Sequence, residues 1–207
     1  IRSLSPANIY QMFTTHLTGK YNPLVLLTFA FEFQIAKLNP FLYHFTNLML
    51  HLCNVALVFA FVRRLWNNLS LALFTALLFG IHPMQVEAVA WITGRKDVLF
   101  TFFYLSSLLA YLNYLKADKK VRKPYYLSAV FFLLALFSKL MAMTLPLILL
   151  LLDWHMRKKI SKDDLIEKIP LFFFAAAFML PTWMAARSVN AFPGTELYGL
   201  FDRILLS

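Results

Sequence analysis

YHFTNLMLHLCNVALVFAFV, residues 43–62, decides what kind of protein this is. At about 1.5 Å per residue, a helix of this length crosses a hydrocarbon core of about 30 Å. Only helices or closed barrels satisfy their backbone hydrogen bonds in lipid, and these apolar residues lack the two-residue alternation of a membrane β-strand. The stretch therefore predicts a transmembrane α-helix.

Further apolar stretches follow along the chain. Residues 98–115 and 169–186 are long enough to cross, whereas 69–81 and the two arms of 125–154 are shorter. Hydrophobic residues make up 60% of the chain and charged residues 14%, which is far more apolar than a soluble domain. The sequence predicts an all-α, polytopic transmembrane helix bundle with about six crossings, some of them short or broken.

The net charge of +10 arises from basic residues that collect in short loops. Under the positive-inside rule, loops 63–68, 116–124 and 155–168 all lie in the cytoplasm. The charge therefore indicates orientation in a bilayer and no nucleic-acid partner. These loops carry Arg63, Arg64, Lys116, Lys119, Lys120, Arg122, Lys123, Arg157, Lys158, Lys159, Lys162 and Lys168.

The number of crossings between two cytoplasmic loops must be even, and this determines which segments are external. Between the first two basic loops the chain must cross the membrane twice, so the loop 82–97 is external. Residues 125–154 form a hairpin with Lys139 near its outer tip, because a single long helix would put one basic loop outside.

Three segments result from this scheme. Residues 1–42 form external interfacial helices, one beginning at Ser5-Pro6 and one along 21–38. Residues 43–187 form the bundle, and residues 188–207 are external and lead into a further helix. The chain is expected to be an internal segment of a longer protein.

A polar stripe runs through the first crossing. His44, Asn47, His51 and Asn54 are spaced to share one face of a helix. Two readings remain open, interhelical hydrogen bonding and one wall of a polar substrate cavity. No metal site is expected, because two histidines two turns apart without a nearby carboxylate match no ligand pattern.

The external loop predicts a short helix, with Pro83 at its first position and Gly94 just past its last. In one reading this helix is an interfacial anchor whose basic residues stabilise its negative end. In the other reading its charged residues converge at the mouth of a cavity. Those residues are His82, Glu87, Arg95, Lys96 and Asp97. Lys139 poses the same choice, because it either snorkels to headgroups or binds an anion.

These residues resemble the transmembrane and tetratricopeptide-repeat-containing (TMTC) family and its bacterial relatives over nearly the whole chain. The most specific element is the run from His82-Pro83 to Gly94-Arg95-Lys96-Asp97. The other matching elements are Tyr21-Asn22-Pro23-Leu24, Asn39-Pro40-Phe41, Tyr43-His44 with Asn47, Ser138-Lys139, Leu145-Pro146 and Leu152-Asp153-Trp154.

The resemblance implies a GT-C-like glycosyltransferase in the bacterial inner membrane or the endoplasmic reticulum membrane. Such enzymes move a sugar, here mannose, from a polyprenyl or dolichyl phosphate carrier to a protein hydroxyl at the outer or lumenal face. The leaving phosphate is expected to be held chiefly by Arg95, with Lys96 or Lys139 as a second cation and His82 nearby. No cofactor is required by the resemblance, although a divalent metal is compatible with it.

Two departures from the family pattern affect the expected chemistry. The family's acidic pair lies just upstream of the segment resembling Ile1-Arg2-Ser3-Leu4, so the catalytic base is expected before Ile1. Leu140 follows Lys139 where family members often carry an acid. The competing functions are a transporter or flippase with the same polar cavity, and a noncatalytic membrane scaffold.

Overall fold

A computed structural model describes residues 4–14, 21–117, 121–158 and 161–188. Within these residues all regular secondary structure is helical, which confirms the all-α prediction. The elements are α1 (Pro6–Thr14), α2 (Pro23–Ala36), α3 (Pro40–Trp66), α4 (Leu69–Ile81), α5 (Gln85–Ala90), η2 (Ile92–Gly94), α6 (Arg95–Lys116), α7 (Lys123–Ser138), η3 (Leu140–Thr144), α8 (Leu145–Arg157) and α9 (Lys162–Ser188).

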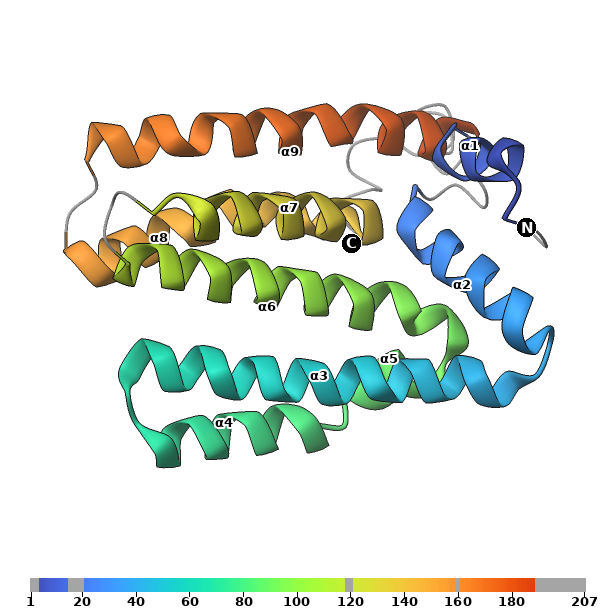
Figure 1. Ribbon diagram of the computed structural model, residues 1–207, viewed down its shortest axis with the longest axis horizontal. Helices are drawn as coiled ribbons and strands as arrows, with labels where there is room; N and C mark the ends of the chain where they lie inside the picture. The colour runs from blue at the N-terminus through green and yellow to red at the C-terminus, as the bar shows by residue number, and fades with distance from the viewer. Residues whose placement is uncertain (1–3, 15–20, 118–120, 159–160, 189–207) are drawn as a thin grey trace, which may run out of the picture.

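Six apolar helices run along one common direction, namely α3, α4, α6, α7, α8 and α9 (Figure 1). Among the described residues, four segments are long and apolar enough to cross a membrane: Pro40–Trp66, Ile92–Lys116, Leu140–Arg157 and Asp164–Met184. The helices α4 and α7 are apolar but shorter. The chain is an integral, multi-pass membrane protein, and helices are present at all six predicted crossings, four of them within segments long enough to span.

The first hairpin shows how short polar signals set helix ends. Asn39 caps α3, since its Oδ1 accepts a hydrogen bond from Phe41 N at 3.0 Å, and Pro40 occupies the first helical position. Asn67 ends α3 in the left-handed conformation, with φ 55°. Asn68 then caps α4 by accepting from Leu71 N at 3.0 Å. Two consecutive asparagines therefore reverse the chain.

A buried hydrophobic cluster lies between α6, α7, η3, α8 and α9. Across the α6–α7 contact, Ser107 Oγ donates to Ser128 O at 2.8 Å, which satisfies a hydroxyl inside the apolar core. The cluster consists of Leu108, Tyr111, Tyr114, Phe132, Ala135, Leu136, Ala142, Leu145, Leu149, Leu152, Leu171 and Ala175.

A buried ion pair joins α8 to α9 inside this core. Lys168 donates to Asp153 and to the Tyr111 hydroxyl, and that hydroxyl lies 2.9 Å from both Asp153 carboxylate oxygens. The side chains of Asp153 and Lys168 are fully buried. Lys168 was expected in a cytoplasmic loop, but it lies within α9 and its charge is neutralised by Asp153. It is therefore a packing residue and does not mark topology.

The helical stretch 125–154 is broken at Lys139, as predicted. α7 ends at Ser138, Lys139 is extended with φ −159° and ψ 134°, and η3 leads into α8. α7 and α8 consequently run in opposite directions (Figure 1).

The described parts of the three basic loops gather at one end of the bundle, here called the basic end (Figure 1). Lys116 donates to Arg64 O, the Trp66 and His155 rings lie 6.1 Å apart, and Arg122 approaches Glu167 at 4.0 Å. Lys119, Lys120 and Lys159 lie outside the described residues. This gathering is what the positive-inside argument requires, although the side of the membrane stays a prediction.

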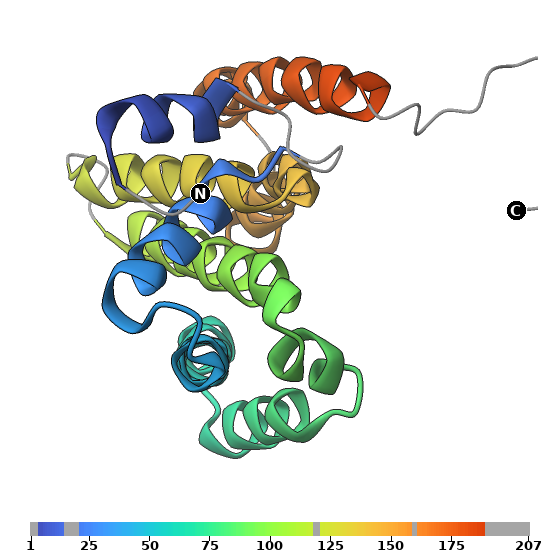
Figure 2. The ribbon, with the colours of Figure 1, turned by 90° about the vertical axis from the view of Figure 1, so that its right-hand side faces the viewer.

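The opposite end, here called the far end, carries α1, α2 and α5, which face the viewer in Figure 2. α2 packs against α3, α6 and α7. Both helices expected within residues 1–42 are present, and Ser5 Oγ accepts from Asn8 N at 3.3 Å at the start of α1. The segment expected at 188–207 lies outside the described residues from 189 onward.

Candidate functional site at the far end

The external loop folds differently from its prediction. A single helix was expected, but α5 ends at Ala90, Trp91 is extended with ψ 125°, and η2 leads directly into α6 at Arg95. Arg95 and Lys96 therefore lie in the first turn of α6 and do not stabilise the negative end of an external helix. α6 also begins three residues earlier than the predicted crossing at Val98.

Gly94 has a packing role instead of the expected helix-ending role. Its φ of −66° is open to any residue. A Cβ at this position would meet the backbone oxygen of Ala88 at 2.5 Å. Only glycine lets η2 approach α5 this closely.

Arg95 is the most enclosed cation of this corner, with 0% of its side chain exposed. Its Nη1 and Nη2 donate to the two Glu32 carboxylate oxygens at 2.8 and 3.1 Å, and Nη2 also donates to Tyr43 O at 2.9 Å. Nε donates to Asn47 Oδ1, and the guanidinium lies 5.1 Å from the Phe29 ring centre. A phosphate would have to displace Glu32, so the expected phosphate role does not fit Arg95.

Sequence reasoning missed Glu32 as the partner of Arg95. It lies on α2, which was placed along the membrane surface, yet it is buried and forms the bidentate pair that ties α2 to α6. The available signal was a lone carboxylate in an otherwise apolar helix. Such a residue requires a cation or water.

The polar stripe of α3 serves interhelical hydrogen bonding. Asn47 reaches the α5–η2 corner, His51 reaches α4 and Asn54 reaches α6, while His44 is exposed. The bonds are Asn47 Nδ2 to Trp91 O at 3.0 Å, His51 Nε2 to Gly80 O at 3.1 Å and Asn54 Nδ2 to Val98 O at 2.9 Å. For Asn47 and Asn54, these contacts support interhelical hydrogen bonding over the wall of a substrate cavity.

A cavity of about 330 Å³ lies between α3, α4 and α5. His51 and His82 are among the residues that line it, and His51 Nδ1 is buried without a hydrogen-bond partner among the described residues. Glu87, expected at a cavity mouth, is exposed on α5 and does not line this one. The lining residues are Leu48, His51, Gly80, Ile81, His82, Gln85, Val86, Val89 and Ala90.

An accessible ion pair lies where α6 begins and α7 ends. Lys139 Nζ contacts the Asp97 carboxylate, with 30% and 33% of the two side chains exposed. The Tyr104 and Thr144 hydroxyls lie 3.3 Å apart and join α6 to η3. Lys96, half-buried, precedes Asp97 in the same turn. Of the three cations expected to bind phosphate, Arg95 is fully buried, whereas Lys139 and Lys96 are accessible to solvent.

Within the described residues, no group of three or more histidine, cysteine or carboxylate side chains is placed to hold a metal ion. The far end instead offers two accessible lysines, an ion-paired carboxylate and a histidine-lined cavity. This set suits binding of an anionic group beside a polar ligand.

Known proteins match nearly half of the chain. Human protein O-mannosyl-transferase TMTC1 is 43% identical over 93 residues, which is 44% of this chain and 10% of that protein. Mouse protein O-mannosyl-transferase TMTC3 is 34% identical over 101 residues, or 49% of the chain and 11% of the relative. Over the matched residues, this chain is TMTC-like. The TMTC-like chain thus spans about a tenth of the length of these relatives.

Drosophila protein O-mannosyl-transferase Tmtc1 is also similar to the TMTC-like chain, at 38% identity over 96 residues, or 46% of the chain and 11% of the relative. No family model and no solved structure matches the chain. The TMTC likeness therefore rests on pairwise sequence identity.

Proposed function

We propose that this chain is part of a membrane glycosyltransferase that moves a sugar, mannose by analogy with its relatives, onto a hydroxyl group of a protein acceptor. The observation that carries the proposal is the 32–43% identity to proteins named O-mannosyl-transferases. The proposed donor is a polyprenyl or dolichyl phosphate sugar, because an integral membrane protein meets a lipid-linked donor within its own bilayer.

The proposed phosphate site is at the far end, with Lys139 as its principal cation. Asp97 positions the Lys139 ammonium, and 30% of the Lys139 side chain is exposed where η3 begins. Lys96 supplies a second positive charge from the same turn of α6 as Asp97, and His82 lines the cavity between α3, α4 and α5. Cations at this place stabilise the charge that develops on a departing phosphate.

The proposed reaction is an inverting transfer. A carboxylate base takes the acceptor's hydroxyl proton, the hydroxyl oxygen forms a bond to the anomeric carbon, and the carbon–oxygen bond to phosphate breaks with its electron pair leaving on phosphate. Glu32 and Asp97 are both ion-paired, so neither is assigned as the base. The base is proposed to come from the segment before Ile1, and the site to open to the endoplasmic reticulum lumen, the bacterial periplasm or the cell exterior.

The test is sugar transfer by the purified full-length protein, with radiolabelled dolichyl phosphate mannose and an acceptor protein. The expected result is label on acceptor serine or threonine hydroxyls. The same protein is also reconstituted into lipid vesicles. If the labelled lipid then moves from one leaflet to the other and no label reaches the acceptor protein, the flippase alternative is correct. Absence of both transfer and transport would support the scaffold alternative and overturn the proposal.

A further inference from the structure

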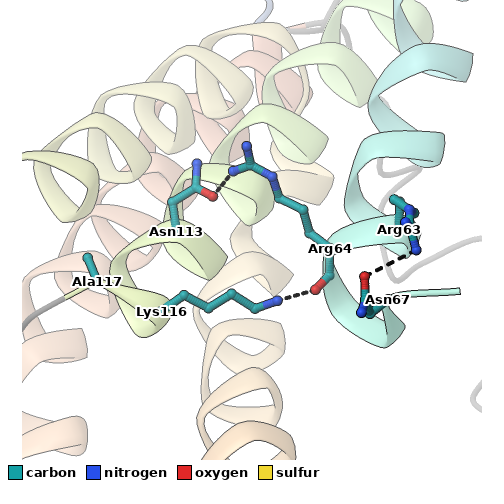
Figure 3. Close-up of a pocket in the computed structure, with 6 residues that line it drawn as sticks. All are labelled: Arg63, Arg64, Asn67, Asn113, Lys116 and Ala117. Carbon is teal, nitrogen blue, oxygen red and sulfur yellow. Dashed lines mark hydrogen bonds between the residues drawn. The ribbon is translucent and has the colours of Figure 1, made fainter.

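A second polar cavity, of about 530 Å³, lies at the basic end between the last turns of α3 and α6. Figure 3 shows Arg64 and Lys116 reaching across the space between these two helices, with Arg63 beside Asn67. The described residues that line it are Arg63, Arg64, Asn67, Asn113, Lys116 and Ala117. None of these lining residues carries a carboxylate. The cations of the cavity therefore differ from Arg95, Lys139 and Lys168, each of which is paired with a carboxylate.

The basic side chains of this cavity bond only neutral oxygens among the described residues. Arg63 Nη1 donates to Asn67 Oδ1 at 3.1 Å, Arg64 Nη1 donates to Asn113 Oδ1, and Lys116 Nζ donates to Arg64 O. By contrast, Arg157 and Lys168 near the same end are paired with carboxylates. Within the described part of the chain, which omits residues 118–120, no carboxylate pairs with the cations of the cavity.

Helix dipoles offset only part of this charge. The ends of α3 and α6 each carry about half a negative charge, so together they compensate about one of the three positive charges and leave about +2. That surplus is more than enough to neutralise the single negative charge of a lipid phosphodiester. Arg64 and Lys116 are exposed and Arg63 is half-exposed, so a ligand can reach all three.

We infer that this cavity binds a phosphate group, and that the phosphate belongs to the headgroup of an anionic lipid in the adjacent leaflet. The cavity opens at the ends of two membrane-spanning segments, which is the depth at which phospholipids carry their phosphates. Basic pockets between transmembrane helices take anionic headgroups, and guanidinium groups grip two phosphate oxygens at once. This inference is independent of the sugar-transfer proposal.

The test uses the full chain in nanodiscs of phosphatidylcholine, titrated with fluorescent phosphatidylglycerol or, in a second arm, with inorganic phosphate. The variant Arg63→Gln with Lys116→Gln removes two cations from the cavity. At roughly 1 kcal/mol per cation, phosphatidylglycerol binding should weaken about 30-fold. The matched control, Lys123→Gln with Lys162→Gln, removes two exposed cations from the same end outside the cavity and should bind as wild type does.

A charge-preserving variant, Arg63→Lys with Lys116→Arg, guards against a folding artefact and should retain most of the binding. Saturable binding in the inorganic phosphate arm alone supports the phosphate site and assigns it to a soluble ligand. Equal losses in the cavity variant and the control would show general surface attraction and overturn the inference. No binding of either probe by the wild type would overturn it as well.

Discussion

Arg95 shows how one buried charge can organise a membrane protein. Its guanidinium joins α2, α3 and α6 through Glu32, Asn47 and Tyr43 O, and all of these contacts are far apart in sequence. An unpaired charge in this place would be costly, and the bidentate partner removes most of that cost. The pair therefore fixes how α2 sits on the bundle.

The residue-scale prediction for this pair is a loss of stability. Glu32→Gln leaves the Arg95 charge buried without its carboxylate, so the free energy of unfolding should fall by about 3 to 5 kcal/mol. Glu87→Gln is the matched control, because Glu87 is exposed on α5, and its effect should stay within about 0.5 kcal/mol. Denaturation in detergent micelles measures both. Equal stability of the two variants would contradict the structural role of Arg95.

A second residue-scale prediction concerns Lys139. If its ammonium holds the leaving phosphate, Lys139→Gln should slow sugar transfer by the full-length protein about 100-fold to 1,000-fold. Lys162→Gln removes an exposed cation at the basic end and should leave turnover unchanged. Initial rates at saturating lipid donor decide the matter. A Lys139→Gln enzyme within about threefold of wild type would remove Lys139 from the phosphate site.

The candidate site was predictable in part from the sequence. The sequence identified the cations of the external loop and the break at Lys139, because charges in apolar surroundings stand out. It did not identify their partners, since the pairs Arg95–Glu32 and Lys139–Asp97 join residues on different helices. Such pairings depend on packing, which periodicity along one helix does not encode.

At the scale of elements, strong local signals gave accurate helix bounds. Residues 69–81 were predicted and α4 is Leu69–Ile81, because an asparagine cap precedes an uninterrupted apolar run. The prediction for the external loop was wrong because Gly94 suggested a helix end. In the structure glycine is needed at this position because a Cβ would clash with the Ala88 carbonyl oxygen. One residue type serves both purposes, and only the tertiary contact distinguishes them.

The element-scale prediction follows from that close approach. Gly94→Ala should force η2 away from α5 and lower the free energy of unfolding by about 1 to 3 kcal/mol. Gly80→Ala is the comparison, because its Cβ would meet the Val55 side chain at 3.1 Å, and a side chain yields more easily than backbone. Thermal unfolding of the two variants checks the order. The prediction fails if Gly80→Ala is the more destabilised.

At the scale of the whole molecule, the two ends are expected to face opposite sides of the membrane. In a Cys53→Ala background, Trp91→Cys should react with an impermeant maleimide from outside intact cells, whereas Arg64→Cys should react only after permeabilisation. Both side chains are exposed, so the difference reports the side of the membrane. Labelling of both positions from outside would reject the orientation.

The length of α4 has a consequence for the lipid around it. Its 13 residues span about 20 Å, whereas the surrounding hydrocarbon is about 30 Å thick. α4 starts at the basic end, so the shortfall falls beyond its last residue, the exposed Ile81. A short apolar helix thins the adjacent bilayer. We expect headgroups beside α4 to sink toward His82, so that a thin membrane accommodates this helix at lower cost than a thick, sterol-rich one.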